Sequence, residues 1–148
     1  MPPPSNTILL VEDDQNDVFF LKHAFECAEV TNPLQVVQDG QEAMDYLQGI
    51  GKYSNRTEFA FPALVLLDLK LPVRPGLEVL HWARQQPRVA GVLIVVLTSS
   101  NDPHDISQAY KLGARSFLVK PLSVSERLEM ARGIKRFWLE LNQFPAPE

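Results

Sequence analysis

The chain has 148 residues, of which 45% are hydrophobic and 22% charged, and this composition fits one globular domain with a core of its own. The formal net charge is −4 and basic residues are scattered, so we expect no nucleic-acid binding. No apolar run approaches the ~20 residues of a membrane span, and the start "MPPPSN" lacks the features of a secretion signal. A cytoplasmic protein without a membrane partner is therefore expected. The single cysteine, Cys27, excludes an internal disulfide and is expected in the core.

Five short runs rich in Val, Ile and Leu predict β-strands, at 7–11, 34–37, 63–67, 92–97 and 116–119. Most lack strict alternation, which is typical of parallel strands covered on both faces. Apolar residues at helical spacing predict helices between and after these strands, at 15–29, 41–48, 77–83, 106–113 and 123–142.

The predicted elements alternate strictly between strand and helix. This order predicts an α/β fold, a doubly wound five-stranded parallel sheet with right-handed crossovers and the flavodoxin-like strand order 2-1-3-4-5. We expect a single domain over 7–142, with flexible tails at 1–6 and 143–148. The long link at 49–62 is expected to be a surface loop and is a candidate for partner contacts.

Polar residues follow four of the predicted strands, and the carboxyl ends of such strands form the ligand site in this architecture. They are Glu12, Asp13 and Asp14, then Asp68, then Thr98, Ser99 and Ser100, and finally Lys120. Clustered carboxylates need a cation, and oxygen ligands without His or Cys favour Mg²⁺. A lysine beside them can pair with an anion held by the metal, most naturally a phosphoryl group. We therefore expect the central Asp68 to be a phosphoryl acceptor.

Four motifs in chain order carry a family resemblance: "ILLVEDD", "LLDLKLP", "VVLTSS" and "FLVKP". Together they resemble the receiver domain of bacterial response regulators in two-component signalling, over residues 7–141. The 49–62 link and the ending "IKRFWLELNQFP" further resemble the single-domain regulators that partner cyanobacterial and bacterial phytochromes.

The resemblance implies that Asp68 takes phosphoryl from a histidine of a sensor kinase, with a phytochrome as a candidate for that kinase. It also implies a Mg²⁺ site made by Asp13, Asp68 and the backbone carbonyl of Lys70, with Glu12 acting directly or through water. Such a protein is not an enzyme beyond its own phosphotransfer and dephosphorylation. With no DNA-binding output domain expected, its output would be protein contact or onward phosphotransfer.

The resemblance assigns four further residues. Lys120 pairs with the phosphoryl group, and its bond to Pro121 is expected to be cis. Thr98 turns its hydroxyl toward the phosphoryl oxygen, and Phe117 is the rotating aromatic switch. Thr98 could instead cap the next helix, although Ser100, Asn101 and Asp102 can also do so, and Phe117 could be a plain core residue. Asp14 is expected to cap the first helix.

Two alternatives to a phosphorylation switch remain open. A haloacid-dehalogenase-like hydrolase also uses an Asp after a strand, but it requires a second acid at the position where this chain has Lys70. A phosphorylation-independent scaffold would be expected to lack one of the site residues. The chain departs from the family at Pro75, where an acid is common, and this change could alter partner contacts.

The last predicted helix carries more apolar surface than a sheet edge needs. The expected stripe is Val124, Leu128, Ala131, Ile134, Trp138 and Leu141, with Met130, Phe137 and Phe144 in addition. We therefore expect a homodimer through the fourth helix, fifth strand and fifth helix. The alternative is that Phe137 and Trp138 fold back under the 49–62 loop.

Overall fold

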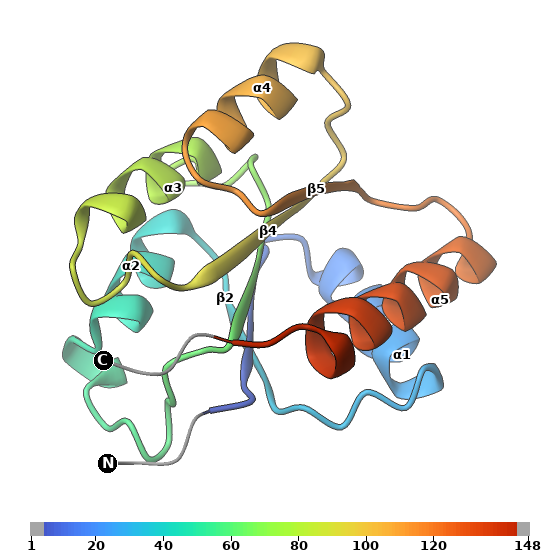
Figure 1. The fold of residues 1–148 in the computed structure, drawn as a ribbon, viewed down its shortest axis with the longest axis horizontal. Helices are drawn as coiled ribbons and strands as arrows, with labels where there is room; N and C mark the ends of the chain where they lie inside the picture. The colour runs from blue at the N-terminus through green and yellow to red at the C-terminus, as the bar shows by residue number, and fades with distance from the viewer. Residues whose placement is uncertain (1–4, 145–148) are drawn as a thin grey trace.

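The computed structural model describes residues 5–144 and has one parallel sheet of order β2-β1-β3-β4-β5 (Figure 1). The strands are β1 (Ile8–Val11), β2 (Leu34–Val37), β3 (Leu64–Leu67), β4 (Leu93–Thr98) and β5 (Ser116–Val119). Each strand begins and ends within one residue of its predicted bounds. The predicted fold class and strand order are confirmed.

Helices cover both faces of this sheet. They are α1 (Gln15–Cys27), α2 (Gly40–Gln48), α3 (Gly76–Gln85), α4 (Pro103–Lys111) and α5 (Val124–Gly133). Figure 1 shows α1 and α5 on one face and α2, α3 and α4 on the other. The predicted last helix is α-helical only in its first half, because it continues as a π-helical segment, η2 (Ile134–Leu141).

The alternation of side chains along the strands creates two cores. In β1, Leu9 and Val11 pack into the cluster beneath α2, α3 and α4, whereas Ile8 and Leu10 pack beneath α1 and α5. Full burial of each such side chain contributes about 1.5–3 kcal/mol. Apolar residues are therefore needed on both faces, which explains why the strands read as unbroken apolar runs.

The turn after β3 is held against the backbone of Asp68. The N–H of Gly76 donates to the carbonyl of Leu69 over 2.9 Å, and a Cβ on Gly76 would lie only 2.3 Å from the Asp68 carbonyl oxygen. Only glycine fits this contact. Pro75 is the N-cap of α3 and makes no side-chain capping bond. Because Pro75 replaces the acid that is common in the family at this position, α3 has no side-chain cap.

The 49–62 link is an ordered lobe packed on α2, and it contains a 3₁₀ turn, η1 (Gly51–Tyr53). The rings of Tyr46, Tyr53 and Phe59 contact one another, with centroids 5.0 to 6.1 Å apart. Arg56 donates to the carbonyls of Tyr46, Leu47 and Phe59 over 2.7, 2.8 and 3.1 Å. The lobe thus extends the core cluster beneath α2, α3 and α4.

Several expectations about apolar residues are wrong. Cys27 is exposed, because it lies outside the stripe of α1 that packs on the sheet. Val124 and Leu141 are also exposed. Trp138 packs on the α1–α5 side, opposite the cluster that holds the 49–62 lobe, and Phe137 is exposed, so neither folds under that lobe.

The single-domain prediction over 7–142 is consistent with one sheet, and the domain bounds stay a prediction. Of the predicted flexible tails, 1–6 and 143–148, residues 1–4 and 145–148 lie outside the described residues. Asn6 is attached to the body, since its carbonyl accepts from the Asn32 side chain over 2.8 Å. Across residues 5–144, no helix has the length and apolarity that crossing a membrane requires.

Candidate functional site

Strand register brings the predicted site residues together. Val11 and Leu67 are register partners in β1 and β3, so the next residues, Glu12 and Asp68, lie side by side. Backbone bonds hold both strand ends, because the Glu12 N–H donates to Val37 and the Asp68 N–H donates to Val11. Glu12 and Asp68 are 3% and 5% exposed, which is unusual for carboxylates.

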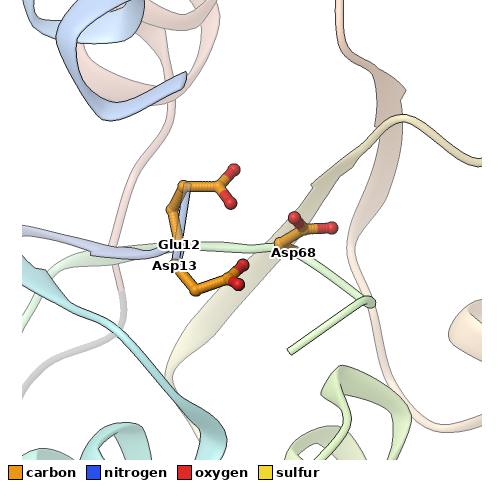
Figure 2. Close-up of side chains that lie close together, drawn as sticks. All are labelled: Glu12, Asp13 and Asp68. Carbon is orange, nitrogen blue, oxygen red and sulfur yellow. The ribbon is translucent and has the colours of Figure 1, made fainter. Parts of the chain in front are cut away.

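Three carboxylates form one acidic cluster at this edge. One oxygen each from Glu12, Asp13 and Asp68 lie within 4.8 Å of one another (Figure 2). Asp13 is exposed while the other two are buried. Buried negative charges at this spacing are stable only with a positive partner. Hard oxygen donors on one open side fit a divalent cation of the Mg²⁺ or Mn²⁺ type.

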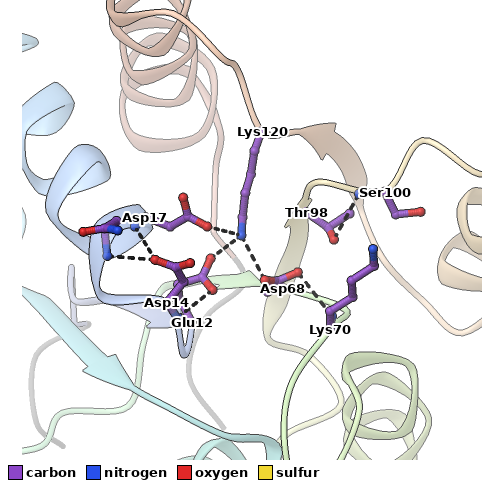
Figure 3. A network of polar contacts seen from close by, with 9 residues as sticks. Glu12, Asp14, Asp17, Asp68, Lys70, Thr98, Ser100 and Lys120 are labelled. Atoms are coloured by element: carbon purple, nitrogen blue, oxygen red, sulfur yellow. Dashed lines mark hydrogen bonds and ion pairs between the residues drawn. The ribbon is translucent and has the colours of Figure 1, made fainter.

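The ammonium of Lys120 is the positive partner that the structure places there (Figure 3). Its Nζ lies 2.5 Å from Glu12 Oε1, 2.8 Å from Asp17 Oδ2 and 2.9 Å from Asp68 Oδ2. The Lys120 backbone N–H donates to the Thr98 carbonyl over 2.7 Å, which fixes the root of the side chain. Asp17 was not among the predicted site residues. The sequence signal that could have indicated Asp17 is its position three residues after the Asp14 cap.

Burial and charge set the protonation of this group. Burial, with a further contribution from the charge of Asp68, raises the pKa of Glu12 to about 7, although the bond from Lys120 opposes the shift. Burial alone would lower the pKa of Lys120, but its bonds to Asp17, Glu12 and Asp68 outweigh that effect and raise it. Lys120 is therefore a permanent cation of the site.

Thr98 and Phe117 lie on the opposite face of the sheet from the ion pairs. Val96 is the register partner of Phe117, and both pack toward α2, α3 and α4. Thr98 lies two residues beyond Val96 on the same face and is completely buried. Its Oγ1 accepts only a long contact, 3.5 Å, from the Ser100 N–H. Phe117 is half-buried and packs against the core rather than lying at the surface.

The remaining predicted residues are placed as follows. The backbone N–H of Lys70 donates to Asp68 Oδ1 over 3.2 Å, so Lys70 adjoins the cluster. Asp14 caps α1, and Asp102 rather than Thr98 caps α4. No cis peptide bond occurs between residues 5 and 144, so the predicted cis bond before Pro121 is wrong in this structure. Lys120 reaches the acids from a trans backbone, the form that X-Pro bonds generally favour.

This chain matches the model of a known protein family. The model of the response regulator receiver domain matches residues 8–132. The chain belongs to the response regulator receiver family.

Three relatives cover nearly the whole of this receiver. Response regulator Rcp1 from Synechocystis sp. is 36% identical over 143 residues, which are 97% of this chain and 95% of Rcp1. The Mn²⁺-bound structure of Rcp1 superposes with a TM-score of 0.86 at 35% identity, covering 95% of this chain and 99% of Rcp1.

The other two relatives are phytochrome response regulators. The phosphorylated cyanobacterial phytochrome response regulator RcpA has a TM-score of 0.88 at 34% identity, covering 97% of this chain and all of RcpA. The bacteriophytochrome response regulator AtBRR has a TM-score of 0.73 at 39% identity, covering 95% of this chain and all of AtBRR. This receiver is therefore similar to regulators that partner both cyanobacterial and bacterial phytochromes.

Proposed function

We propose that this receiver is the phosphoacceptor of a two-component phosphorelay, with Asp68 as the acceptor. One observation carries the proposal. A buried Asp68 shares an oxygen cluster with two further acids and contacts the Lys120 ammonium at 2.9 Å. That combination provides a nucleophile, a place for a cation and a fixed positive charge at one point.

The cation is Mg²⁺ in this proposal, and it would neutralise charge on the phosphoryl group when bound. Glu12, Asp13, Asp68 and the backbone carbonyl of Lys70 would hold it. The Mn²⁺-bound structure of Rcp1 supports a divalent cation in a related protein. Asp13, as an exposed acid, leaves part of the site open to water, as Mg²⁺ prefers.

The transfer step moves one phosphoryl group. An Asp68 oxygen forms a bond to phosphorus, and the bond from phosphorus to the kinase histidine nitrogen breaks, with its electron pair returning to the imidazole. Lys120 pairs with the phosphoryl oxygens as charge develops. Hydrolysis later returns phosphate and the free carboxylate. The receiver thus promotes only its own modification and its reversal.

The partners follow from the same proposal. The phosphodonor is a sensor histidine kinase, and RcpA and AtBRR make a phytochrome the first candidate. We propose a cytoplasmic location, where a lone exposed thiol such as Cys27 stays reduced. A homodimer through α4, β5 and α5 is part of the proposal, because Tyr110 of α4, Val119 of β5 and Phe137 of η2, which continues α5, are exposed.

Thr98 and Phe117 are the proposed switch. The phosphoryl group would offer Thr98 a charge-assisted hydrogen bond, which replaces its weak 3.5 Å contact with Ser100. Movement of Thr98 would alter the packing of Phe117 on the same sheet face and bias the α4–β5–α5 surface.

We expect Thr98→Ala to accept phosphoryl but to lose most of the conformational response. Amide chemical shifts recorded with and without a phosphoryl mimic measure it, and an unchanged response would contradict the coupling.

Phosphorylation by a small acyl phosphate tests the proposal. With Mg²⁺, the wild type should gain one hydroxylamine-labile phosphoryl group by intact mass, whereas Asp68→Asn and the chelator-treated wild type should gain none. Asp13→Ala should require far more Mg²⁺. A wild type that is never labelled, yet binds its kinase, would instead favour the phosphorylation-independent scaffold. Membership of the receiver family leaves no support for the hydrolase alternative.

A further inference from the structure

Asp17 contacts the site residues but belongs to neither the acidic cluster nor the predicted switch. Its Oδ2 accepts from Lys120 Nζ over 2.8 Å, joining α1 to the end of β5 across 103 residues of sequence. An acid in the first turn of a helix is ordinarily explained by the helix dipole. That explanation does not require the carboxylate to reach a lysine on another element, so the contact calls for a reason of its own.

The backbone fixes both ends of this ion pair. Asp14 Oδ1 accepts from the N–H groups of Asn16 and Asp17, over 2.8 and 3.2 Å, and so sets the first turn of α1. Lys120 is anchored at its own N–H by the Thr98 carbonyl. Lys120 and Asp68 also point to the α1 side of the sheet, where Figure 3 shows Asp17 directed at the ammonium. The contact is therefore a product of the fold.

The ammonium has three protons and three carboxylate partners. Glu12, Asp17 and Asp68 each lie within 2.9 Å of Nζ. Glu12 and Asp68 also belong to the acidic cluster, and Asp17 does not. A cation held by the cluster would draw oxygens of Glu12 and Asp68 toward itself and would repel the ammonium. Of the three contacts, only the one to Asp17 is independent of the metal.

We propose that Asp17 is a positioning residue that keeps Lys120 in the site when Mg²⁺ is bound. This inference rests on the proposed function. Without Asp17, the flexible lysine stem would regain rotamer freedom and turn into solvent. With Asp17, one donor stays anchored and the other two are free for phosphoryl oxygens. The effect acts through Lys120, so it changes binding of the anion rather than binding of the metal.

Binding of beryllofluoride, a phosphoryl mimic, tests the role of Asp17 in the presence of Mg²⁺. The variant Asp17→Asn removes the charge without a change of shape, Asp17→Glu restores the charge, and Glu26→Gln is the control. Glu26 is an exposed acid on the same helix, away from the site. Titration gives the Mg²⁺ and beryllofluoride affinities separately. Thermal unfolding and the ¹⁵N signal of the Lys120 ammonium complete the measurements.

We expect Asp17→Asn to bind beryllofluoride about two- to fivefold more weakly, the range for a partly exposed ion pair that orders a lysine. Its Mg²⁺ affinity should change less, Asp17→Glu should recover part of the loss, and Glu26→Gln should match the wild type. In the wild type, the Lys120 ammonium signal should remain protected on Mg²⁺ addition, and it should broaden in Asp17→Asn.

Equal beryllofluoride binding by Asp17→Asn and wild type would overturn this inference but not the proposed function. A parallel loss of Mg²⁺ and anion affinity would also overturn it, because it would indicate general damage to the site. If Asp17→Asn does not fold, the wild-type ammonium signal decides, and loss of protection on Mg²⁺ addition contradicts the anchor. A wild type that binds no beryllofluoride would overturn the proposed function and the inference with it.

Discussion

At the scale of single residues, one lysine makes the acidic site possible. Glu12 and Asp68 are buried acids, and Lys120 contacts both, so most of their charge is compensated within the protein. Removal of Lys120 would leave buried charges unpaired, which generally costs several kcal/mol. The ammonium therefore stabilises the site in the absence of a cation, and under the proposed function a bound metal would replace it as the partner of the acids.

The protonation of Glu12 gives a pH dependence with a definite sign. Its pKa is about 7 when folded, against an ordinary 4.5, so folding favours the protonated form. The resulting stabilisation is fully present below about pH 4.5 and is lost as pH rises through about 7. In chelator, the free energy of unfolding of the wild type minus that of Glu12→Gln should fall by about 3 kcal/mol across this window. Urea unfolding at several pH values measures it, and a pH-independent difference would contradict it.

Sequence patterns predicted most of the site because strand order and chain order together bring residues to one edge. Glu12, Asp13, Asp68 and Lys120 were all predicted, and they lie together. Asp17 was missed because an acid in a first helical turn has a common local explanation. The trans bond at Pro121 and the exposed Cys27 were also missed, because each depends on tertiary packing rather than on a local pattern.

At the scale of elements, the strands were predictable and the last helix was not. Unbroken apolar runs define β1, β3 and β4, since both faces of these strands are buried. The π-helical register of η2 is a packing outcome that periodicity of 3.6 does not reveal. Leu141 is exposed, contrary to the predicted stripe, whereas Trp138 packs on the α1 side as the stripe predicted.

The contacts that hold the 49–62 lobe on α2 could not be predicted from its composition. Arg56 donates to two carbonyls at the C-terminal end of α2 and to Phe59, and its charge complements the helix dipole. Arg56→Met should lower the free energy of unfolding by about 2–3 kcal/mol, because buried carbonyls lose a charged donor. Lys52→Met, a change at an exposed residue of the same lobe, is the control and should change the free energy of unfolding far less than Arg56→Met does. Chemical denaturation measures both, and equal effects would contradict the proposed role of Arg56.

At the scale of the whole molecule, the site and the surface proposed for dimerisation share β5. Lys120 follows its carboxyl end, Phe117 lies within it, and exposed Val119 lies beside the proposed contact surface. Phe137 is 56% exposed and lines an open groove of about 490 Å³ with Leu118 and Trp138. An exposed aromatic at such a groove is typical of an interface. Phosphorylation and association should therefore be linked.

Sedimentation at micromolar concentration tests this association. The wild type should dimerise, more strongly with a phosphoryl mimic, and Phe137→Glu should shift it toward monomer because the interface would bury an unpaired charge. Phe19→Glu makes the same change at an exposed phenylalanine of α1 and should leave the dimer intact. A wild type that stays monomeric with and without the mimic would contradict the interface.

The central claim is that Asp68 is the residue that carries the phosphoryl group. Borohydride reduces an aspartyl phosphate to homoserine, and peptide mapping by mass spectrometry then locates the modified residue. After treatment with an acyl phosphate and Mg²⁺, the account predicts homoserine at position 68 and at no other acid. Homoserine at Asp13 or Asp14, or a phosphoryl group that borohydride does not remove, would contradict it.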